Sequence, residues 1–448
     1  MRLTFYGGTK TVTGSNYLLE HDGKKIIIDC GVFQGSNYVE RQNFKPFPFD
    51  PKEISAAFIT HAHIDHTGRL PKLIRDGFSG TLYSTEPTRE FSQHLLKDSI
   101  SIMSRESKRC KETGFCLPEN IEKLMQQWKG VPYHESFEHG PFTITFYNAG
   151  HILGSSFIEI RAGDITVVFS GDLGNSPVPL ITPREPLERA DYCLIESTYG
   201  NREHKARAKI RDELEDMIED AARSGGTLMI PAFSMERTQI LLYHINSLIE
   251  EGRIPKIPIF LDSPLAIRLT NVYEQFVDEL DIKPEYIGND GKLFEFPALK
   301  KTLTTKESRS IASVKPPKVI IAGAGMSQGG RIIHHEKLYL PDPNSHILFV
   351  GYQIRGSLGR RILDGAEEVR IMKKTVPVRA RVKEISGYSA HADKRQLLEW
   401  LTPARFSLKR VFVVQGEIEQ SEPFARAVQD ELAVDVVIPS YGETVELL

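Results

Sequence analysis

The sequence predicts an α/β protein of two domains, with the second domain inserted into the first. The 448 residues are more than one ordinary hydrophobic core contains. Short apolar runs fill residues 1–195, and each stops at a polar residue. Residues 210–353 instead alternate apolar strands with amphipathic helices, as in a parallel sheet covered on both faces. The first pattern returns after residue 376, which predicts the insertion.

The composition is that of a water-soluble globular protein, with 40% hydrophobic and 26% charged residues. No apolar run reaches the roughly 18–20 residues of a membrane span. The start, "MRLTFYGGTK", lacks the apolar segment of a secretory signal. Four cysteines without a CxxC pair are too few for a disulfide scaffold. We therefore expect a reducing compartment, the cytoplasm.

The net charge of −3 excludes an overall basic nucleic-acid binder but not a local basic patch. Basic clusters occur in "SRESKRCK" (104–111) and "REHKARAKIR" (202–211). Two interpretations stay open for them, solvated helix faces and a track for a polyanion.

The apolar runs of the first segment place polar residues at strand ends. "KKIIIDCG" ends at Asp29, and "ISAAFITHAH" ends at a group of histidines. "PFTITFYNAGH" ends at His151, "DITVVFSGD" at Asp172 and "ADYCLIES" at Glu196. The carboxyl ends of strands are where α/β folds place their sites, so this edge is the predicted functional edge.

The middle segment follows helix and strand periods in turn. Its first helix carries apolar residues at helical spacing over 210–221 and ends at Gly225–Gly226. "TLMIPAF" predicts a strand, "ERTQILLYHINSLIEEG" a helix and "IPIFLDS" a strand, and "KVIIAGAG" and "HILFVGYQ" predict two more strands. This alternation predicts a second α/β domain.

The last segment returns to the first style. "VPVRARVKEI" alternates as a half-exposed strand does, and "ADKRQLLEWL" predicts a helix that Asp393 can cap. "KRVFVVQG" predicts a buried strand that ends at Gln415. The predicted domains are therefore residues 1–198 and 376–448 for the first and residues 199–375 for the insertion.

The stretch "ITHAHIDHTG" gathers three histidines and one aspartate within positions 61–66. His61 and His63 lie two apart on an extended segment and point the same way, while Asp65 and His66 can face a second point. Imidazole and carboxylate are zinc ligands, so this pattern predicts one or two ions. For Asp29 two interpretations stay open, a turn aspartate and an acceptor that orients a ligand histidine.

Several motifs carry a family resemblance. "HAHIDHTG", "GHILGS" and "SGDLGN" resemble the motifs of the metallo-β-lactamase superfamily. "IESTYGNREH", "IPAFSMERTQILL", "AGAGMSQGGRIIHH", "GYQIRGSLGRRILDG" and "SGYSAHADKRQLLEWL" resemble those of its β-CASP branch. That branch cleaves nucleic acids and includes the endonuclease subunit of the eukaryotic pre-mRNA 3′-end cleavage factor. The resemblance implies an αββα metallo-β-lactamase fold interrupted by a parallel-sheet β-CASP domain.

The resemblance also implies a set of site residues. One zinc ion would be held by His61, His63, His151 and Asp172. A second would be held by Asp65, His66, bridging Asp172 and a histidine near the C-terminus. Asp65 is then expected to act in catalysis. Glu196 and His391 fall on the family's acid–histidine pair, with His391 as a general acid, although a strand-end turn for Glu196 and helix packing for His391 are the structural alternatives.

Two further anion contacts are predicted. Ser389 and the backbone of residues 322–330 are candidates to cradle phosphates, since glycine-rich turns at helix starts favour anions. Ordinary tight turns give the same glycine pattern, so both interpretations stay open. Arg331 stands beside this turn, where it reaches either a phosphate or solvent.

One position departs from the family pattern. The family supplies its last histidine ligand from a "VxHGE" segment, and this chain reads "VFVVQGEIEQ" with Gln415 in that place. An amide oxygen is a weaker zinc ligand than imidazole. The second position is therefore expected to bind zinc weakly, to take Mn²⁺, to have water in place of the ligand, or to use Glu417 instead.

The predicted function is hydrolysis of phosphodiester bonds in single-stranded RNA by hydroxide that a metal ion activates. Three alternatives stay open: a nuclease directed at DNA, an RNA-binding homologue that is inactive because of Gln415, and a small-molecule hydrolase. The expected partner is single-stranded RNA, without a membrane, and a homodimer stays open.

Overall fold

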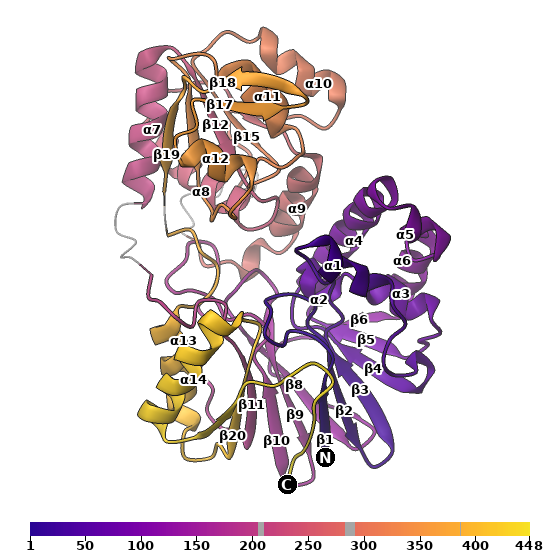
Figure 1. Cartoon of the computed structure of the whole chain (residues 1–448). Helices are drawn as coiled ribbons and strands as arrows, with labels where there is room; N and C mark the ends of the chain where they lie inside the picture. Colours follow the sequence, from indigo (N-terminus) through magenta and orange to yellow (C-terminus); the bar gives the residue numbers. More distant parts are fainter. Residues whose placement is uncertain (205–209, 283–291, 386) are drawn as a thin grey trace. The chain divides into compact units, whose positions relative to one another are not determined.

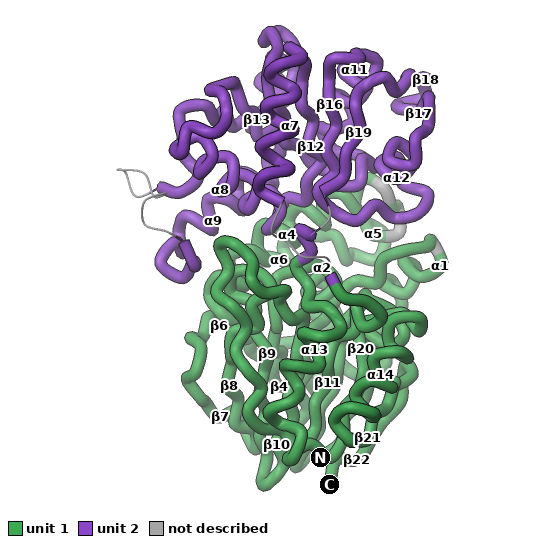
Figure 2. The backbone as a smooth tube through the Cα atoms, turned by 90° about the vertical axis from the view of Figure 1, so that its left-hand side faces the viewer, with its two compact units in different colours: residues 1–203, 390–448 green, residues 204–389 purple. Residues whose placement is uncertain are grey.

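The computed structural model describes residues 1–204, 210–282, 292–385 and 387–448. The chain forms two compact units (Figure 2). Unit 1 combines residues 1–203 with residues 390–448, and unit 2 spans residues 204–389. Among the described residues, no helix is long and apolar enough to cross a membrane.

The first sheet of unit 1 is mixed and has the order β22-β1-β2-β3-β4-β5-β6. Strands β22, β1, β2 and β3 pair antiparallel, and β3 to β6 pair parallel. The strands are β1 (Arg2–Phe5), β2 (Tyr17–His21), β3 (Lys24–Ile28), β4 (Ile54–Phe58), β5 (Thr81–Ser84), β6 (Trp128–Gly130) and β22 (Thr444–Glu446).

The second sheet of unit 1 is also mixed, with the order β21-β20-β11-β10-β9-β8-β7. Strands β7 to β10 pair antiparallel, and β10, β11, β20 and β21 pair parallel. The strands are β7 (Phe137–His139), β8 (Phe142–Asn148), β9 (Ser156–Ala162), β10 (Ile165–Phe169), β11 (Tyr192–Glu196), β20 (Arg410–Val414) and β21 (Asp435–Val437).

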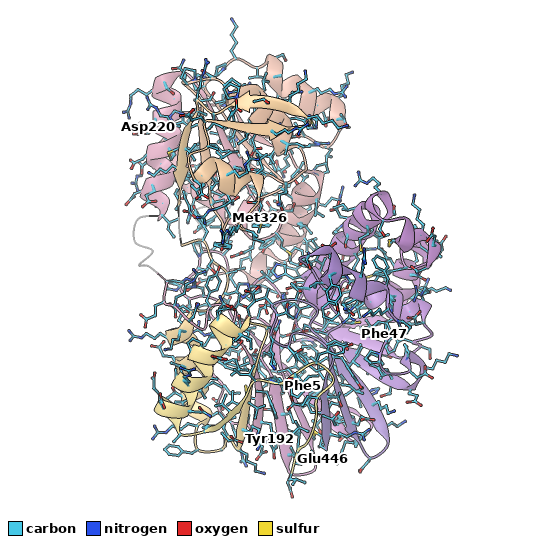
Figure 3. The ribbon with its side chains drawn as sticks, viewed as in Figure 1. Phe5, Phe47, Tyr192, Asp220, Met326 and Glu446 are labelled. Carbon is cyan, nitrogen blue, oxygen red and sulfur yellow. A yellow bond between two sulfur atoms is a disulfide. The ribbon has the colours of Figure 1, made fainter. Side chains whose placement is uncertain are left out.

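The two sheets pack face to face around a shared core. Phe5, labelled in Figure 3, places its ring 5.2 Å from that of Phe412 in the other sheet. Alternate residues of a strand face opposite sides, so the β4 residues Ala56 and Phe58 join this core while Ala57 faces outward. The sheets thus form the two inner layers of unit 1.

Helices cover the outer face of each sheet (Figure 1). The first sheet carries α3 (Leu70–Arg75), α4 (Glu86–Glu106) and α6 (Pro118–Gln126), and the second carries α13 (Lys394–Leu401) and α14 (Ile418–Leu432). The short helices of this unit are α1 (Asn37–Glu40), α2 (Ile64–Thr67) and α5 (Lys108–Glu112). The predicted αββα arrangement is confirmed.

Unit 1 also contains one disulfide, between Cys110 and Cys116. The other two cysteines, Cys30 and Cys193, are free and buried. The sequence predicts no disulfide scaffold, and a single bond across six residues is a local closure beside α5.

Unit 2 is built on a six-stranded sheet of order β14-β13-β15-β12-β16-β19, in which each neighbouring pair is parallel. This confirms the predicted parallel sheet. Its strands are β12 (Thr227–Pro231), β13 (Ile259–Leu261), β14 (Leu299–Lys301), β15 (Lys318–Ala322), β16 (His346–Phe349) and β19 (Arg381–Glu384). The helices are α7 (Ile210–Ser224), α8 (Arg237–Glu250), α9 (Pro264–Gln275), α10 (Thr305–Ser310), α11 (Ile332–Tyr339) and α12 (Leu358–Leu363).

Compact unit 2 extends beyond residue 376. Strands β17 (Glu368–Ile371) and β18 (Lys374–Pro377) form a hairpin in unit 2, and β19 pairs with β16. The single strand predicted for "VPVRARVKEI" is wrong, because the chain leaves β18 after Pro377 and enters β19 at Arg381, at the edge of the sheet. Unit 1 resumes at Ala390.

Candidate metal centre

The candidate site of unit 1 is built at strand ends of both sheets. His61 and His63 follow β4, His151 follows β8, and Asp172 follows β10. These four residues each offer one ligand atom, and the atoms lie within 4.8 Å of one another. His61 and His151 are almost completely buried, as is Asp172. Residues from distant parts of the sequence therefore meet at the edge that the strand ends predict.

The ligand atoms face a common centre. His63 Nδ1 lies 3.1 Å from His61 Nε2 and 3.2 Å from His151 Nε2. Asp172 Oδ2 lies 3.4 Å from His61 Nε2 and 3.6 Å from His151 Nε2. Zinc bonds of about 2.0–2.1 Å in a tetrahedron place neighbouring ligand atoms about 3.3–3.4 Å apart. These four separations are close to the tetrahedral value, so the side chains form a candidate site for one zinc ion.

Hydrogen bonds to the opposite ring nitrogens fix the orientation of two of these histidines. His151 Nδ1 lies 3.4 Å from the carbonyl oxygen of Ala390, to which it can donate, and this directs the Nε2 lone pair to the centre. His61 Nδ1 lies 3.1 Å from Thr60 Oγ1, which donates in turn to Asp29. Such partners set the tautomer and the basicity of a ligand histidine.

Asp29 collects several donors beneath the site. Its carboxylate accepts from Thr60 N at 2.9 Å, from Ser15 Oγ at 3.1 Å and from His66 Nδ1 at 2.6 Å. Asp29 has a φ of +58°, which turns the chain sharply after β3. The sequence singles out Asp29, but not Thr60 or Ser15. Thr60 directly precedes His61, but nothing in the sequence pattern distinguishes it before its contact with Asp29 is known.

Burial and neighbouring charges shift the pKa values in the metal-free protein. Burial, with His61 as a neighbour, holds the pKa of His63 well below its ordinary range, and burial beside His391 does the same for His151. Both rings are thus neutral and offer lone pairs. Burial would raise the pKa of Asp172, but the surrounding histidines, His66 and His61 foremost, lower it well below its usual value. His63, His151 and Asp172 therefore favour the protonation states that zinc requires.

The residues expected to hold a second ion include His66 and Asp172, and the side chain that contacts both is Gln415. His66 Nε2 lies 3.3 Å from Asp172 Oδ1, and Gln415 Nε2 lies 2.7 Å from His66 Nε2 and 3.0 Å from Asp172 Oδ1. Burial would lower the pKa of His66, but Asp172 and Asp29 raise it well above its ordinary value. Burial raises the pKa of Asp65. Glu417 is exposed, whereas Gln415 is 2% exposed, so Glu417 does not substitute for it.

Glu196 and His391 form a contact pair beside the centre. His391 Nδ1 lies 3.3 Å from both carboxylate oxygens of Glu196 and 3.8 Å from Asp172 Oδ2. Glu196 also accepts from the backbone of Leu173 at 2.7 Å. Burial would lower the pKa of His391, but Glu196 and Asp172 raise it to about 10. An imidazolium held by a carboxylate is an arrangement suited to proton donation.

The predicted phosphate contacts lie in unit 2. Ser389 is its last residue, and the turn at 323–331 folds back on itself, with Ile332 N donating to Gly323 O. Arg331 donates to Asp262 Oδ1 at 2.8 Å and to the carbonyl oxygens of Thr302 and Leu303. Arg331 thus holds loops of its own unit together, and the roles of Ser389 and the turn stay predictions.

The sequence matches three family descriptions along its length. Residues 10–218 match the metallo-beta-lactamase superfamily, and residues 238–362 match the Beta-Casp domain. Residues 375–439 match the Zn-dependent metallo-hydrolase RNA specificity domain. The order of these matches agrees with the insertion of unit 2 into unit 1.

Individual relatives match nearly the whole chain. Ribonuclease TTHA0252 of Thermus thermophilus is 37% identical over 421 residues, 94% of each chain. Transcription termination factor FttA of Methanosarcina mazei is 32% identical over all of this chain and 72% of its own length. A solved structure of a protein of unknown function from Enterococcus faecalis shares the fold, with a TM-score of 0.57 and 12% identity, over 100% of this chain and 99% of that one.

Proposed function

This chain belongs to the β-CASP ribonuclease family of the metallo-β-lactamase superfamily, and on that premise we propose that it hydrolyses phosphodiester bonds of single-stranded RNA. The observation that carries the proposal is the convergence of buried His61, His151 and Asp172 with half-buried His63. The match to an RNA specificity domain over residues 375–439 supports RNA over DNA as the substrate.

The four converging residues would hold one zinc ion, since they supply three imidazole nitrogens and a carboxylate oxygen, with four separations of 3.1–3.6 Å among them. Zinc, when bound, acts as a Lewis acid and lowers the pKa of water from 15.7 to about 7. The role of Thr60 and Asp29 is to keep His61 in the tautomer that faces the ion. This interpretation makes Asp29 a positioning residue.

Hydrolysis requires that a water oxygen bonds to phosphorus while the bond from phosphorus to the leaving ribose oxygen breaks. Asp65 is our candidate to accept the proton of the attacking water, because burial raises the pKa of its carboxyl group and so makes the carboxylate a stronger base. His391 would give a proton to the leaving oxygen, with Glu196 holding its Nδ1. A general acid typically contributes 10²–10⁴-fold to the rate.

The test compares cleavage of an end-labelled single-stranded RNA with that of a DNA strand of matched sequence, with and without added zinc. Asp172→Ala should abolish cleavage, because it removes a carboxylate of the site. Asp191→Ala is the matched control, since Asp191 is 9% exposed and caps the backbone of Thr166 in the same unit. Intact RNA under all zinc concentrations, or equal cleavage by Asp172→Ala, would overturn the proposal.

A further inference from the structure

The amide of Gln415 lies between His66 and Asp172, two residues to which the family resemblance assigns a second metal ion. Its Nε2 lies 2.7 Å from His66 Nε2 and 3.0 Å from Asp172 Oδ1. These two acceptors are 3.3 Å apart, close to the separation of two atoms bound to one ion. Gln415 is 2% exposed, and His66 and Asp172 are buried. The amide is therefore an enclosed part of the site.

Donor and acceptor chemistry settles which amide atom faces the pair. A carboxylate oxygen accepts hydrogen bonds, so the amide nitrogen is the atom that suits the position 3.0 Å from Asp172 Oδ1. His66 Nδ1 lies 2.6 Å from Asp29 Oδ2 and donates to it, so when the ring is neutral its Nε2 is free to accept from the amide. The two N–H groups of one amide then serve both acceptors, one each.

The alternative orientation also fills this position. A His66 ring with both nitrogens protonated would call for Gln415 Oε1 at 2.7 Å, and that oxygen would then lie 3.0 Å from a carboxylate oxygen. Two acceptors at that distance repel, so the orientation with the nitrogen inward is favoured. In either orientation the amide group stands between His66 and Asp172.

The backbone holds Gln415 in this place from both sides. Its N donates to Gly8 O at 2.7 Å, and its carbonyl oxygen accepts from Thr198 Oγ1 at 3.1 Å. Its φ of +49° is uncommon for a residue with a side chain, and it directs the side chain from the end of β20 into the site. Gly8 leaves room for the Gln415 side chain, because a Cβ at position 8 would lie 3.2 Å from Gln415 Cγ and 2.6 Å from Tyr17 Oη.

We propose that the Gln415 amide replaces a second metal ion by bridging His66 and Asp172 through hydrogen bonds. This chain would then work with one zinc ion. The inference rests on the proposed function. An amide donor compensates part of the negative charge of Asp172 Oδ1 and leaves Oδ2 for the first ion. Asp65 is then released from metal binding and remains available as a base.

The test is the zinc content of purified protein after saturation and gel filtration, measured by inductively coupled plasma mass spectrometry without RNA. Wild type should retain one zinc per chain, and Gln415→His should retain two. His tolerates positive φ better than most residues, which favours folding of this variant. Two ions in wild type, or one in Gln415→His, would overturn the inference.

A second variant guards against misfolding of the first. Gln415→Ala removes the amide without adding a ligand, and its thermal unfolding shows whether the site folds without the bridge. We expect one zinc per chain there as well, with RNA cleavage reduced because Asp172 loses a donor. Full cleavage by Gln415→Ala would show that the amide has no such task. Absence of zinc from every variant would instead refute the first site and the proposed function.

Discussion

Replacement of Asp29 by Asn tests whether a residue outside the metal shell controls zinc binding. Asp29 Oδ1 accepts from Thr60 N at 2.9 Å, and an Asn oxygen can keep that bond. At the Oδ2 position, an Asn NH₂ group would face Ser15 Oγ, Thr60 Oγ1 and His66 Nδ1, each of which now has its hydrogen directed to Oδ2. The chain of hydrogen bonds must therefore reverse.

Thr60 connects the reversed hydrogen bonds of residue 29 to His61, the candidate zinc ligand. Its hydroxyl would accept from the Asn amide and donate to His61 Nδ1, which moves the His61 proton to Nε2 and away from a liganding state. Partners of this kind are worth about 10–100-fold in metal affinity, or ~1.4–2.8 kcal/mol. We therefore expect the zinc dissociation constant of Asp29→Asn to rise by about this factor.

The assay is competition for zinc against a chromophoric chelator, with circular dichroism as a check on folding. Asp191→Asn is the matched control, because Asp191 Oδ2 also accepts from a backbone N–H, that of Thr166 at 2.9 Å, but without contact to the site. An Asp29→Asn protein that folds and binds zinc within twofold of wild type would refute the reasoning.

Three further predictions follow from other contacts. Glu196→Gln should lower kcat by about 10²–10⁴-fold with unchanged zinc content, because His391 loses its carboxylate, and unchanged single-turnover rates would contradict this. Asp262→Ala should cost about 3–5 kcal/mol of unit 2 stability in urea unfolding, since Arg331 and His335 lose a shared buried carboxylate; a loss below 1 kcal/mol would count against it. Burial would raise the pKa of Asp262, but its hydrogen bonds, including those from His335 and Arg331, hold it below its usual value. The stabilisation by Asp262 should therefore be full above about pH 4 and decline below it. Asp262→Asn should not show this decline. Without reductant, thiol reagents should label neither Cys30 nor Cys193 in the folded protein and both after unfolding, and labelling of all four cysteines then would exclude the Cys110–Cys116 disulfide.

Much of the fold could be predicted from periodicity. The inserted parallel sheet follows from uniformly apolar runs such as "KVIIAGAG" separated by helical spacing, and β15 (Lys318–Ala322) lies there, fully buried. The end of the insertion was harder to place, because the alternation in 376–383 indicates exposure on one face and says nothing about the partner strand. Pairing of β19 with β16 depends on tertiary contacts.

Some residues of the candidate site could also be predicted from the sequence, and others could not. His61, His63, His151 and Asp172 share residue chemistry and a place at strand ends, so their convergence could be predicted from the sequence. Thr60 could not, since a threonine beside a metal motif has no distinguishing pattern until its contact with Asp29 is seen. The sequence also marks Gln415 as a departure from the family, but only the distances to His66 and Asp172 indicate what its amide does instead.

The most direct test of the central claim is a zinc titration of RNA cleavage with metal-stripped protein. The single-stranded RNA cleavage rate should rise in proportion to added zinc and reach its plateau at one equivalent per chain. In the same titration, the Gln415→His protein should continue to bind zinc until two equivalents per chain are bound. A wild-type rate that stays at zero through the first equivalent and rises only with the second would contradict a site of one ion bridged by Gln415.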